Sequence, residues 1–239
     1  MNALGCRPAD VVGPATTVRR RLAVRGRWIE VGIARVEGGS SLSVAGARLA
    51  ERLVARLLEV PHRRIRVAPL PPSGRPVVVH DGAGGDCGVS ISHLCRRHPS
   101  GCVGVVAVAA CRGAGIGLDI VAPAEIVPAS LARFLTPHER AMTSDPHGAA
   151  VVWAAKEAAF KASGLDEGFR PRRVVIDQLT ARGFAWRVRG DFRAVVGEGG
   201  FLLADDHVLA IAVADRIPDR IADHEKNSSP PLEESNPTP

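Results

Sequence analysis

The sequence predicts an α+β protein. Short apolar runs bounded by Pro- and Gly-rich turns indicate strands, and two segments, 42–60 and 147–163, have the spacing and end signals of helices. A short similarity between HPSGCVGVVAVAA (98–110) and DDHVLAIAVAD (205–215) hints at two related halves that each close with a strand. At 239 residues the chain is long enough to bury a proper hydrophobic core.

The first half of the chain begins with an Arg-rich stretch, residues 1 to about 26, that reads as irregular. RWIEVGIARV (27–36) alternates between apolar and polar residues as a strand does. In 42–60 leucines recur at helical spacing, and Pro61 ends that helix. The Pro- and Gly-rich stretch 69–88 reads as a loop.

The second half opens with two apolar runs, GCVGVVAVAAC (101–111) and GIGLDIV (115–121). The turn between them is so short that we predict a β-hairpin. The later helix, 147–163, ends at Gly164. Further strands are expected at about 173–176, 184–188, 194–196, 201–204 and 208–214. From Asp219 onward the chain has few apolar residues and many Pro, Ser and Glu, which predicts a disordered tail.

The net charge of +6 predicts an acidic substrate or partner, which could be a nucleic acid, a phosphorylated small molecule or an acidic protein. With no Tyr, 3 Trp and 6 Phe, the chain lacks the stacking aromatics of a nucleic-acid binder, so we expect no nucleic-acid partner. The start of the chain lacks a secretory signal and no apolar run spans a membrane, so we expect a cytoplasmic protein without a membrane partner. Five scattered cysteines without a CxxC pair predict reduced, buried thiols.

The stretch WAAKEAAFKASG (153–164) holds two of the three lysines in a chain that otherwise uses Arg. Glu157 and Lys161 are four residues apart and share a helix face, whereas Lys156 lies well around the helix from Lys161. Arg would serve a surface ion pair at least as well. Lysine is favoured where a single phosphate oxygen must be met or a proton delivered.

Asp119 lies near the end of the apolar run GIGLDIV, where an unpaired carboxylate is costly. It either caps a turn or meets a cation or hydrogen-bond donors. The glycines of this run do not form a dinucleotide-binding motif, because Leu118 occupies the place of the third glycine and no helix follows.

In this order, GIGLDIV, FLTPHE and WAAKEAAFK resemble the signature of the 4'-phosphopantetheinyl transferase superfamily. GRP (74–76) and SISH (90–93) resemble segments of its larger, surfactin-synthetase-activating type, so the resemblance covers about residues 28–215. Two positions depart from the pattern. Val121 stands where many members carry a third acidic ligand, so a water is expected to fill that place, and Ser90 replaces an Asn.

The resemblance implies a 4'-phosphopantetheinyl transferase fold, a pseudo-twofold pair of similar α/β subdomains with small antiparallel sheets. The N-terminal subdomain, 1–112, would contact coenzyme A, and the C-terminal subdomain, 113–218, would carry the metal and catalytic residues. Residues 219–239 would form the tail. The length and the two-part layout favour a monomer, with coenzyme A in a groove between the subdomains.

The implied reaction transfers the 4'-phosphopantetheine arm of coenzyme A to a serine of an apo acyl or peptidyl carrier protein and releases 3',5'-ADP. Asp119 and Glu157 would bind Mg²⁺ together with the substrate phosphates. Glu157 would also help to deprotonate the serine, while Lys161 would hold the phosphates and stabilise the leaving group.

The predicted contacts with coenzyme A involve four further residues. His93 and Arg75 would bind its phosphate groups, and Ser92 belongs to the same SISH segment. Lys156 would make either a flanking phosphate contact or a structural ion pair. The alternatives to a transferase are a non-catalytic basic module that binds nucleic acid or an acidic protein, and a degenerate transferase that binds carrier proteins without modifying them.

Overall fold

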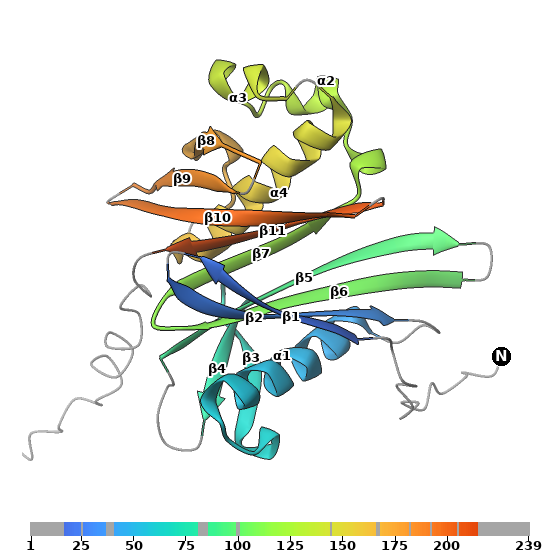
Figure 1. The fold of residues 1–239 in the computed structure, drawn as a ribbon, viewed down its shortest axis with the longest axis vertical. Coiled ribbons are helices and arrows are strands. Elements are labelled where there is room, and N and C mark those ends of the chain that lie inside the picture. Colours follow the sequence, from blue (N-terminus) through green and yellow to red (C-terminus); the bar gives the residue numbers. More distant parts are fainter. Residues whose placement is uncertain are drawn as a thin grey trace, which may run out of the picture.

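The protein consists of two antiparallel sheets with a helix on the outer side of each (Figure 1), as seen in a computed structural model. The structure describes residues 17–24, 26–36, 41–80, 86–98, 101–143, 145–165, 168–181, 183–191, 193–204 and 206–214. The predicted tail, 219–239, lies outside these residues. The predicted α+β class is confirmed.

The first half of the chain builds the N-sheet, in the strand order β1-β2-β6-β5, and a separate β3-β4 hairpin. Its elements are β1 (Thr17–Val24), β2 (Arg27–Val36), α1 (Leu42–Leu58), η1 (His62–Arg64), β3 (Ile65–Leu70), β4 (Arg75–His80), β5 (Cys87–His98) and β6 (Gly101–Arg112).

The second half builds the C-sheet, in the strand order β7-β11-β10-β9-β8. Its elements are β7 (Gly115–Val121), η2 (Pro123–Glu125), α2 (Pro128–Leu131), α3 (Pro137–Ala141), α4 (Pro146–Ser163), η3 (Pro171–Arg173), β8 (Val174–Leu179), β9 (Phe184–Arg189), β10 (Ala194–Ala204) and β11 (His207–Ala214).

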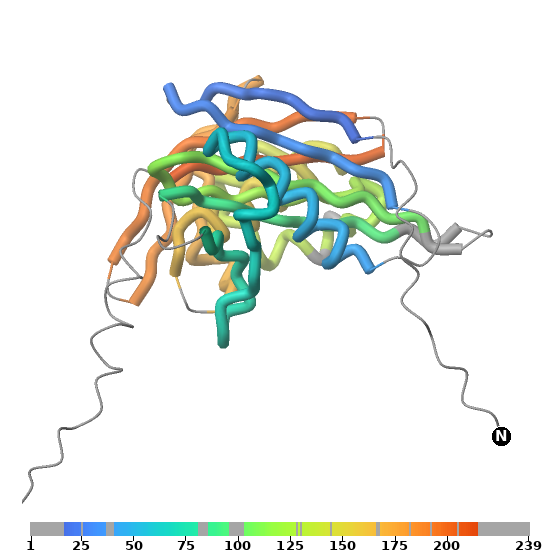
Figure 2. The backbone as a smooth tube through the Cα atoms, turned by 90° about the horizontal axis from the view of Figure 1, so that it is seen from below, coloured from blue at the N-terminus to red at the C-terminus, as the bar shows by residue number. Residues whose placement is uncertain are grey.

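Three hydrophobic clusters hold these layers together. The first lies between α1 and the N-sheet, and the second lies between the two sheets, where Ile29 and Val31 meet Leu118 and Ile211. The third lies between the C-sheet and α4, which is lined with alanines. Figure 2 shows the layers from below, with β1 at one margin of the N-sheet. The order of layers is therefore helix, sheet, sheet, helix.

The two halves have corresponding topologies. In each, a strand precedes a long helix, a 3₁₀ turn, a hairpin and two further strands, so that β2, α1 and β6 correspond to β7, α4 and β11. The turns even share an Arg-Arg pair, in PHRRI (61–65) and RPRRV (170–174). The segments 98–110 and 205–215, whose similarity hinted at two halves, fall mainly on β6 and β11. The predicted division at residues 112 and 113 falls between β6 and β7.

Three predictions about individual elements are wrong. Residues 17–24 form strand β1 instead of an irregular stretch, and the expected loop 69–88 contains all of β4. The predicted hairpin of 101–111 with 115–121 does not exist, because β6 pairs with β2 and β5 while β7 pairs with β11. Residues 106–111 and all of 115–121 are buried on both faces of their strands, and a short turn can carry the chain from one sheet to the other as well as back along the same sheet.

The glycine of β7 at position 117 sets the distance to α4. A Cβ atom there would come within 1.8 Å of the Ala158 carbonyl oxygen, so only glycine permits this approach. The helix begins with Asp145, whose carboxylate accepts the Gly148 N–H at 2.8 Å, and ends at Gly164 with φ 67°. The strand and the helix are therefore held in close contact at the place where the candidate site lies.

The prediction that the cysteines are reduced, buried thiols is only partly correct. Cys87 and Cys111 are buried free thiols, as predicted, and burial raises the pKa of Cys87 to about 12. Cys95 is exposed and disulfide-bonded, so the prediction of reduced, buried thiols is wrong for it. Cys6 and the side chain of Cys102 lie outside what the structure describes.

In the described ranges no helix is long and apolar enough to cross a bilayer, and a cytoplasmic location stays a prediction.

Candidate functional site

The centre of the candidate site is a group of three charged side chains from β7 and α4. The ammonium of Lys161 lies 2.7 Å from Asp119 Oδ1 and 3.9 Å from Glu157 Oε2. It also donates a hydrogen bond to the Leu118 carbonyl oxygen at 3.1 Å. The structure thus brings together the two carboxylates and the lysine that the sequence predicts to share one site.

Asp119 is held where the edges of the two sheets meet. β5 ends the N-sheet and β7 ends the C-sheet, and two serines of β5 join these edge strands. Ser92 donates its hydroxyl to Asp119 Oδ1 at 2.8 Å, and Ser90 Oγ accepts the Leu118 N–H at 2.9 Å. Asp119 is only 4% exposed, so these donors and Lys161 supply what a buried carboxylate requires.

Glu157 lies beside Asp119, and its carboxyl has a raised pKa. Burial, and after it the negative charge of Asp119, raise the pKa of Glu157 to about 7. The positive charge of Lys161 and a hydrogen bond from the Trp153 side chain act in the opposite direction. Glu157 therefore carries a carboxyl that changes its protonation near neutral pH, which is the property required of a general base or acid.

The Asp119–Glu157 pair has the chemistry of a site for a hard divalent cation. Two carboxylates approach one another with a single ammonium to offset their charge, and a bound cation would relieve the repulsion that raises the pKa of Glu157. Among the described residues no third Asp, Glu, His or Cys completes a ligand cluster, and Val121 is a buried apolar residue. Mg²⁺ fits this donor set, because it commonly takes one or two carboxylates together with substrate phosphates and water.

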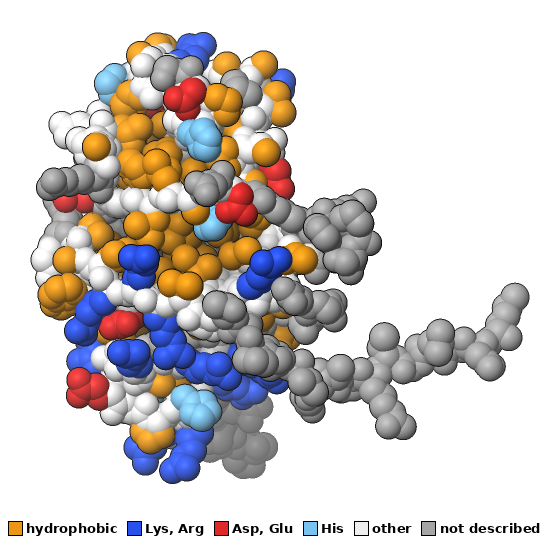
Figure 3. Space-filling view, turned by 45° about the vertical axis from the view of Figure 1, so that its right-hand side comes forward, with side chains coloured by type: hydrophobic (Ala, Val, Ile, Leu, Met, Phe, Trp, Pro, Cys, Tyr) orange, Lys and Arg blue, Asp and Glu red, His pale blue; other side chains and the backbone are white. Residues whose placement is uncertain are grey.

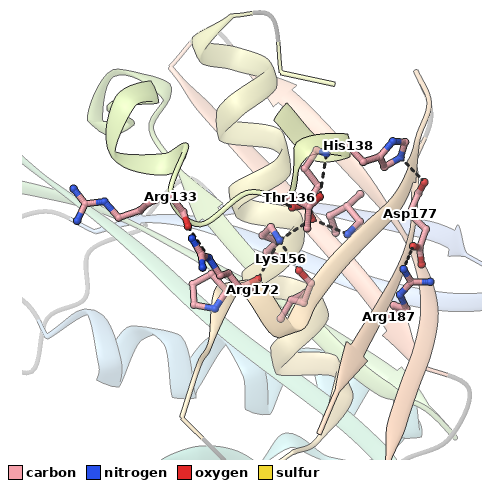
Figure 4. Close-up of polar contacts among 11 residues, drawn as sticks. Arg133, Thr136, His138, Lys156, Arg172, Asp177 and Arg187 are labelled. Carbon is pink, nitrogen blue, oxygen red and sulfur yellow. Dashed lines mark hydrogen bonds and ion pairs between the residues drawn. The ribbon is translucent and has the colours of Figure 1, made fainter. Parts of the chain in front are cut away.

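Lys156 lies away from this group. Its ammonium is 2.6 Å from Glu139 Oε1, and both side chains are fully buried. It also donates to the carbonyl oxygens of Pro171 and Val174, while Glu139 accepts the backbone N–H groups of Thr136 and Ile176. Figure 4 shows Lys156 enclosed between Thr136 and the residues around β8.

This enclosure favours one of the two roles considered for Lys156. An ammonium without exposed surface cannot reach a phosphate group of a ligand, so the geometry supports the structural ion pair and gives no support to the predicted contact with coenzyme A. Burial lowers the pKa of Lys156, and the contact with Glu139 opposes that shift. The pair joins α3 to α4 and β8 and fixes how α4 is turned about its axis.

The remaining predicted residues lie on β4 and β5. Arg75, at the start of β4, donates to the Leu165 carbonyl oxygen and places its guanidinium 5.7 Å from the centre of the Phe160 ring. It therefore connects the first half of the chain to the end of α4. His93 is exposed and, by strand alternation, lies on the opposite face of β5 from Ser92. The structure does not group His93 with Asp119.

Three residues of the site had no role assigned from the sequence. Trp153 is four residues before Glu157 and donates to it, Glu139 is the partner of Lys156, and Ser90 joins the two edge strands. The spacing of Trp153 and Glu157 on one helix face was available as a signal. Glu139 precedes its partner Lys156 by 17 residues, and Ser90 precedes its partner Leu118 by 28 residues. Only the fold reveals these two contacts.

Comparison with protein families gives a match over the second half of the chain. Residues 115–212 match the model of the 4'-phosphopantetheinyl transferase superfamily. The match runs from β7 into β11 and includes Asp119, Glu157 and Lys161. No curated protein matches the chain significantly. The predicted resemblance to this superfamily is confirmed for the matched segment, and the larger, surfactin-synthetase-activating type stays a prediction.

Proposed function

We propose that this protein is a 4'-phosphopantetheinyl transferase that moves the phosphopantetheine arm of coenzyme A to a serine of an apo acyl or peptidyl carrier protein. The observation that carries the proposal is the meeting of Asp119, Glu157 and Lys161 at one place, inside the segment that matches the superfamily. A pyrophosphate is a poor electrophile until its charge is neutralised, and this group offers both a cation site and an ammonium.

Glu157 acts as the base in the proposed reaction. The serine oxygen attacks the phosphorus that bears the pantetheine, a new P–O bond forms, and the bond to 3',5'-ADP breaks. The serine proton passes to the Glu157 carboxylate, directly or through one water. Before a cation binds, burial and the charge of Asp119 raise the pKa of this carboxylate to about 7, so it is largely ionised, and able to accept a proton, in mildly alkaline solution.

Lys161 stabilises the negative charge that develops on the 5'-phosphate of the leaving 3',5'-ADP. Its side chain is 33% exposed and stands beside Asp119, so it can meet a phosphate oxygen without crossing the core. Asp119 and Glu157 would hold Mg²⁺, which when bound supplies positive charge to the pyrophosphate. Ser92 and Trp153 orient these two carboxylates through the hydrogen bonds described above.

The first half of the chain supplies the contacts with the rest of coenzyme A in this proposal. Arg75 and His93 are the anion-binding residues that we assign to it. Ser92 gives its hydroxyl hydrogen to Asp119, so we assign it to positioning that carboxylate. We further propose that the protein works as a monomer, with coenzyme A between residues 1–112 and 113–218.

The carrier protein is proposed to dock beside the end of α4. A chain of aromatic contacts runs from Phe134 through Trp153 and Phe169 to Phe160, with ring centres 5.3–6.0 Å apart. These partly buried rings, with Arg75 stacked on Phe160, offer an apolar and basic border to the catalytic group. The carrier serine must pass this border to reach Glu157.

The direct test is mass spectrometry of apo carrier proteins of fatty-acid, polyketide and peptide-synthase origin after incubation with the protein, coenzyme A and Mg²⁺. We expect at least one carrier to gain the mass of one phosphopantetheine group. Glu157→Gln should abolish the gain, whereas Glu125→Gln, at an exposed position on η2, should not. If coenzyme A binds and no carrier gains mass, the degenerate transferase is correct. If coenzyme A does not bind, the basic module is favoured.

A further inference from the structure

A strongly basic surface lies on the first half of the molecule, outside the catalytic group. We call it the arginine surface and define it by residues of β1 and α1: Arg19, Arg20, Arg21, Arg48, Arg52 and Arg56. All six are exposed. Arg56 and the three arginines of β1 line one hollow of about 390 Å³ together with Glu30 and Glu59. Figure 3 shows Lys and Arg side chains gathered over the lower part of one face.

Most of this positive charge has no partner within the described part of the chain. Arg21 is the exception, since its Nε lies 3.1 Å from Glu30, whose side chain is only 8% exposed. Glu30 thus fixes Arg21 in place over the Trp28 ring, 5.2 Å from the ring centre, and Trp28 itself is 57% exposed. The surface therefore combines unpaired guanidinium groups with an exposed aromatic ring that is held in position.

Ordinary structural needs account for only part of these arginines. β1 ends its sheet, and charges on an edge strand prevent unwanted pairing with another chain. Arg56 lies in the last turn of α1, where a cation meets the helix dipole. Neither need explains Arg48 and Arg52, which continue the line of Arg56 along the exposed side of α1 at four-residue intervals.

We propose that the arginine surface docks an acidic α-helix of a partner protein. Arginines at every fourth position stand about 6 Å apart, one helical turn, and so match carboxylates at the same interval on a helix lying along α1. The guanidinium fork pairs with a carboxylate through two hydrogen bonds. Arg and Trp are also the residues most enriched in the energetically important parts of protein interfaces.

The composition of the hollow favours a protein over a nucleic acid. Glu30 and Glu59 stand among its arginines and would repel the dense, regular charge of a phosphate backbone. A helix with spaced carboxylates can avoid both. Trp28 is the single aromatic ring beside these arginines in the described contacts, whereas nucleic-acid surfaces use several stacking rings.

The arginine surface and the catalytic group lie on different sides of the N-sheet: α1 packs on the outer face of this sheet, over β6, β5 and β2, whereas Ser90 and Ser92 of β5 face the C-sheet. β1 forms one edge and β5, which carries Ser92, forms the other, with β2 and β6 between them. Three strand spacings separate these edges by about 14 Å. A helix bound along β1 and α1 therefore does not cover the catalytic group, and the proposal does not depend on the proposed transferase activity.

The test uses fluorescence anisotropy with a labelled synthetic helix of about six turns that carries Glu at every fourth position. A second peptide has the same composition with its Glu residues distributed around the helix. The triple variant Arg19→Gln, Arg52→Gln, Arg56→Gln is compared with a control of equal charge, Arg140→Gln, Arg189→Gln, Arg193→Gln, at exposed positions of the second half. Circular dichroism confirms that both variants are folded.

We expect the protein to bind the patterned peptide at least about fivefold more tightly than the scattered one. The arginine-surface variant should bind about tenfold more weakly than the parent, because three charged contacts are lost, and the control variant less than about twofold more weakly. Equal binding of both peptides, equal loss in both variants, or no binding by the parent would each overturn the proposal. Tighter binding of a DNA duplex with the same dependence on Arg19, Arg52 and Arg56 would also overturn it, in favour of a nucleic acid.

Discussion

The two lysines of α4 form ion pairs of opposite character within five residues. Lys156 and Glu139 are both fully buried, and backbone groups satisfy their remaining hydrogen-bonding capacity. Lys161 is 33% exposed and faces two carboxylates, Asp119 and Glu157, of which the second is 29% exposed. Five residues turn an α-helix by about 140° beyond a full circle, which points one lysine into the core and the other toward solvent.

One helix, α4, therefore serves both stability and chemistry. We call Lys156 and Glu139 the sealed pair. It has one carboxylate for one ammonium and no access for a ligand, so it can only hold α3, α4 and β8 together. We call Lys161, Asp119 and Glu157 the open group. It has two carboxylates for one ammonium and therefore an excess of negative charge, which a cation or a phosphate-bound metal can offset. Enclosure and the balance of charge, not residue type, separate the two lysines.

The largest effect that we predict is on stability and comes from the sealed pair. Lys156→Met would leave the Glu139 carboxylate buried without its counter-ion, which costs about 3–5 kcal/mol of the free energy of unfolding. Urea unfolding followed by circular dichroism measures this loss. Lys161→Met removes one partner of the buried Asp119 carboxylate, but Ser92 still donates to that carboxylate and the lysine end is partly exposed, so the loss should be smaller, about 1–2 kcal/mol. Similar losses in the two variants would remove the distinction between the lysines.

The next effect is on activity and comes from the open group. Lys161→Met removes the ammonium that stabilises the 5'-phosphate of the leaving 3',5'-ADP, so kcat/KM for carrier modification should fall about 10²–10³-fold, as for the loss of one transition-state donor. Steady-state assays with a fixed carrier protein and varied coenzyme A measure this change. Transfer at the parent rate by a folded Lys161→Met variant would show that the open group is not the catalytic one.

The motifs predicted the open group but not the sealed one. Asp119, Glu157 and Lys161 could be placed together because their residue types and order resemble a known signature, and the structure brings them within contact. Lys156 could not be assigned, because its burial depends on Glu139, which the structure places on the separate short helix α3. His93 and Ser92 are neighbours in sequence, yet strand alternation sends them to opposite faces of β5.

Both long helices and most strands were predicted, and the errors concern β1, β4 and the pairing of β6 with β7. Helices α1 and α4 were predicted because their apolar spacing and their end residues agree. The pairing of β6 and β7 was misjudged because a sheet-to-sheet crossing and a hairpin can use the same short turn. The β1 strand was missed because three consecutive arginines, 19–21, interrupt the alternation of apolar and polar residues, although Leu22 and Val24 pack against the cluster between the sheets.

The smallest effect that we predict concerns the charge excess of the open group. Glu157→Gln keeps the shape of the side chain and removes one of the two neighbouring carboxylates. The pKa of Glu157 is raised to about 7 in the folded protein from an ordinary value of 4.5, so its ionisation destabilises the fold. Below pH 4.5 the group is protonated in both states and costs nothing. Between pH 4.5 and 7 the cost grows as the unfolded chain loses the proton first, and above pH 7 it stays constant.

Glu157→Gln should therefore be more stable than the parent by about 1–2 kcal/mol at pH 8 and equal to it at pH 4, when both are measured in EDTA. The gain in unfolding free energy across this pH range is the measurement, and Glu125→Gln, at an exposed position, should show none. Excess Mg²⁺ should stabilise the parent and reduce the difference at pH 8, because the cation offsets the charge that the substitution removes. A Gln variant that is less stable than the parent at pH 8 would mean that Lys161 already balances both carboxylates, and the contrast with the sealed pair would then rest on exposure alone.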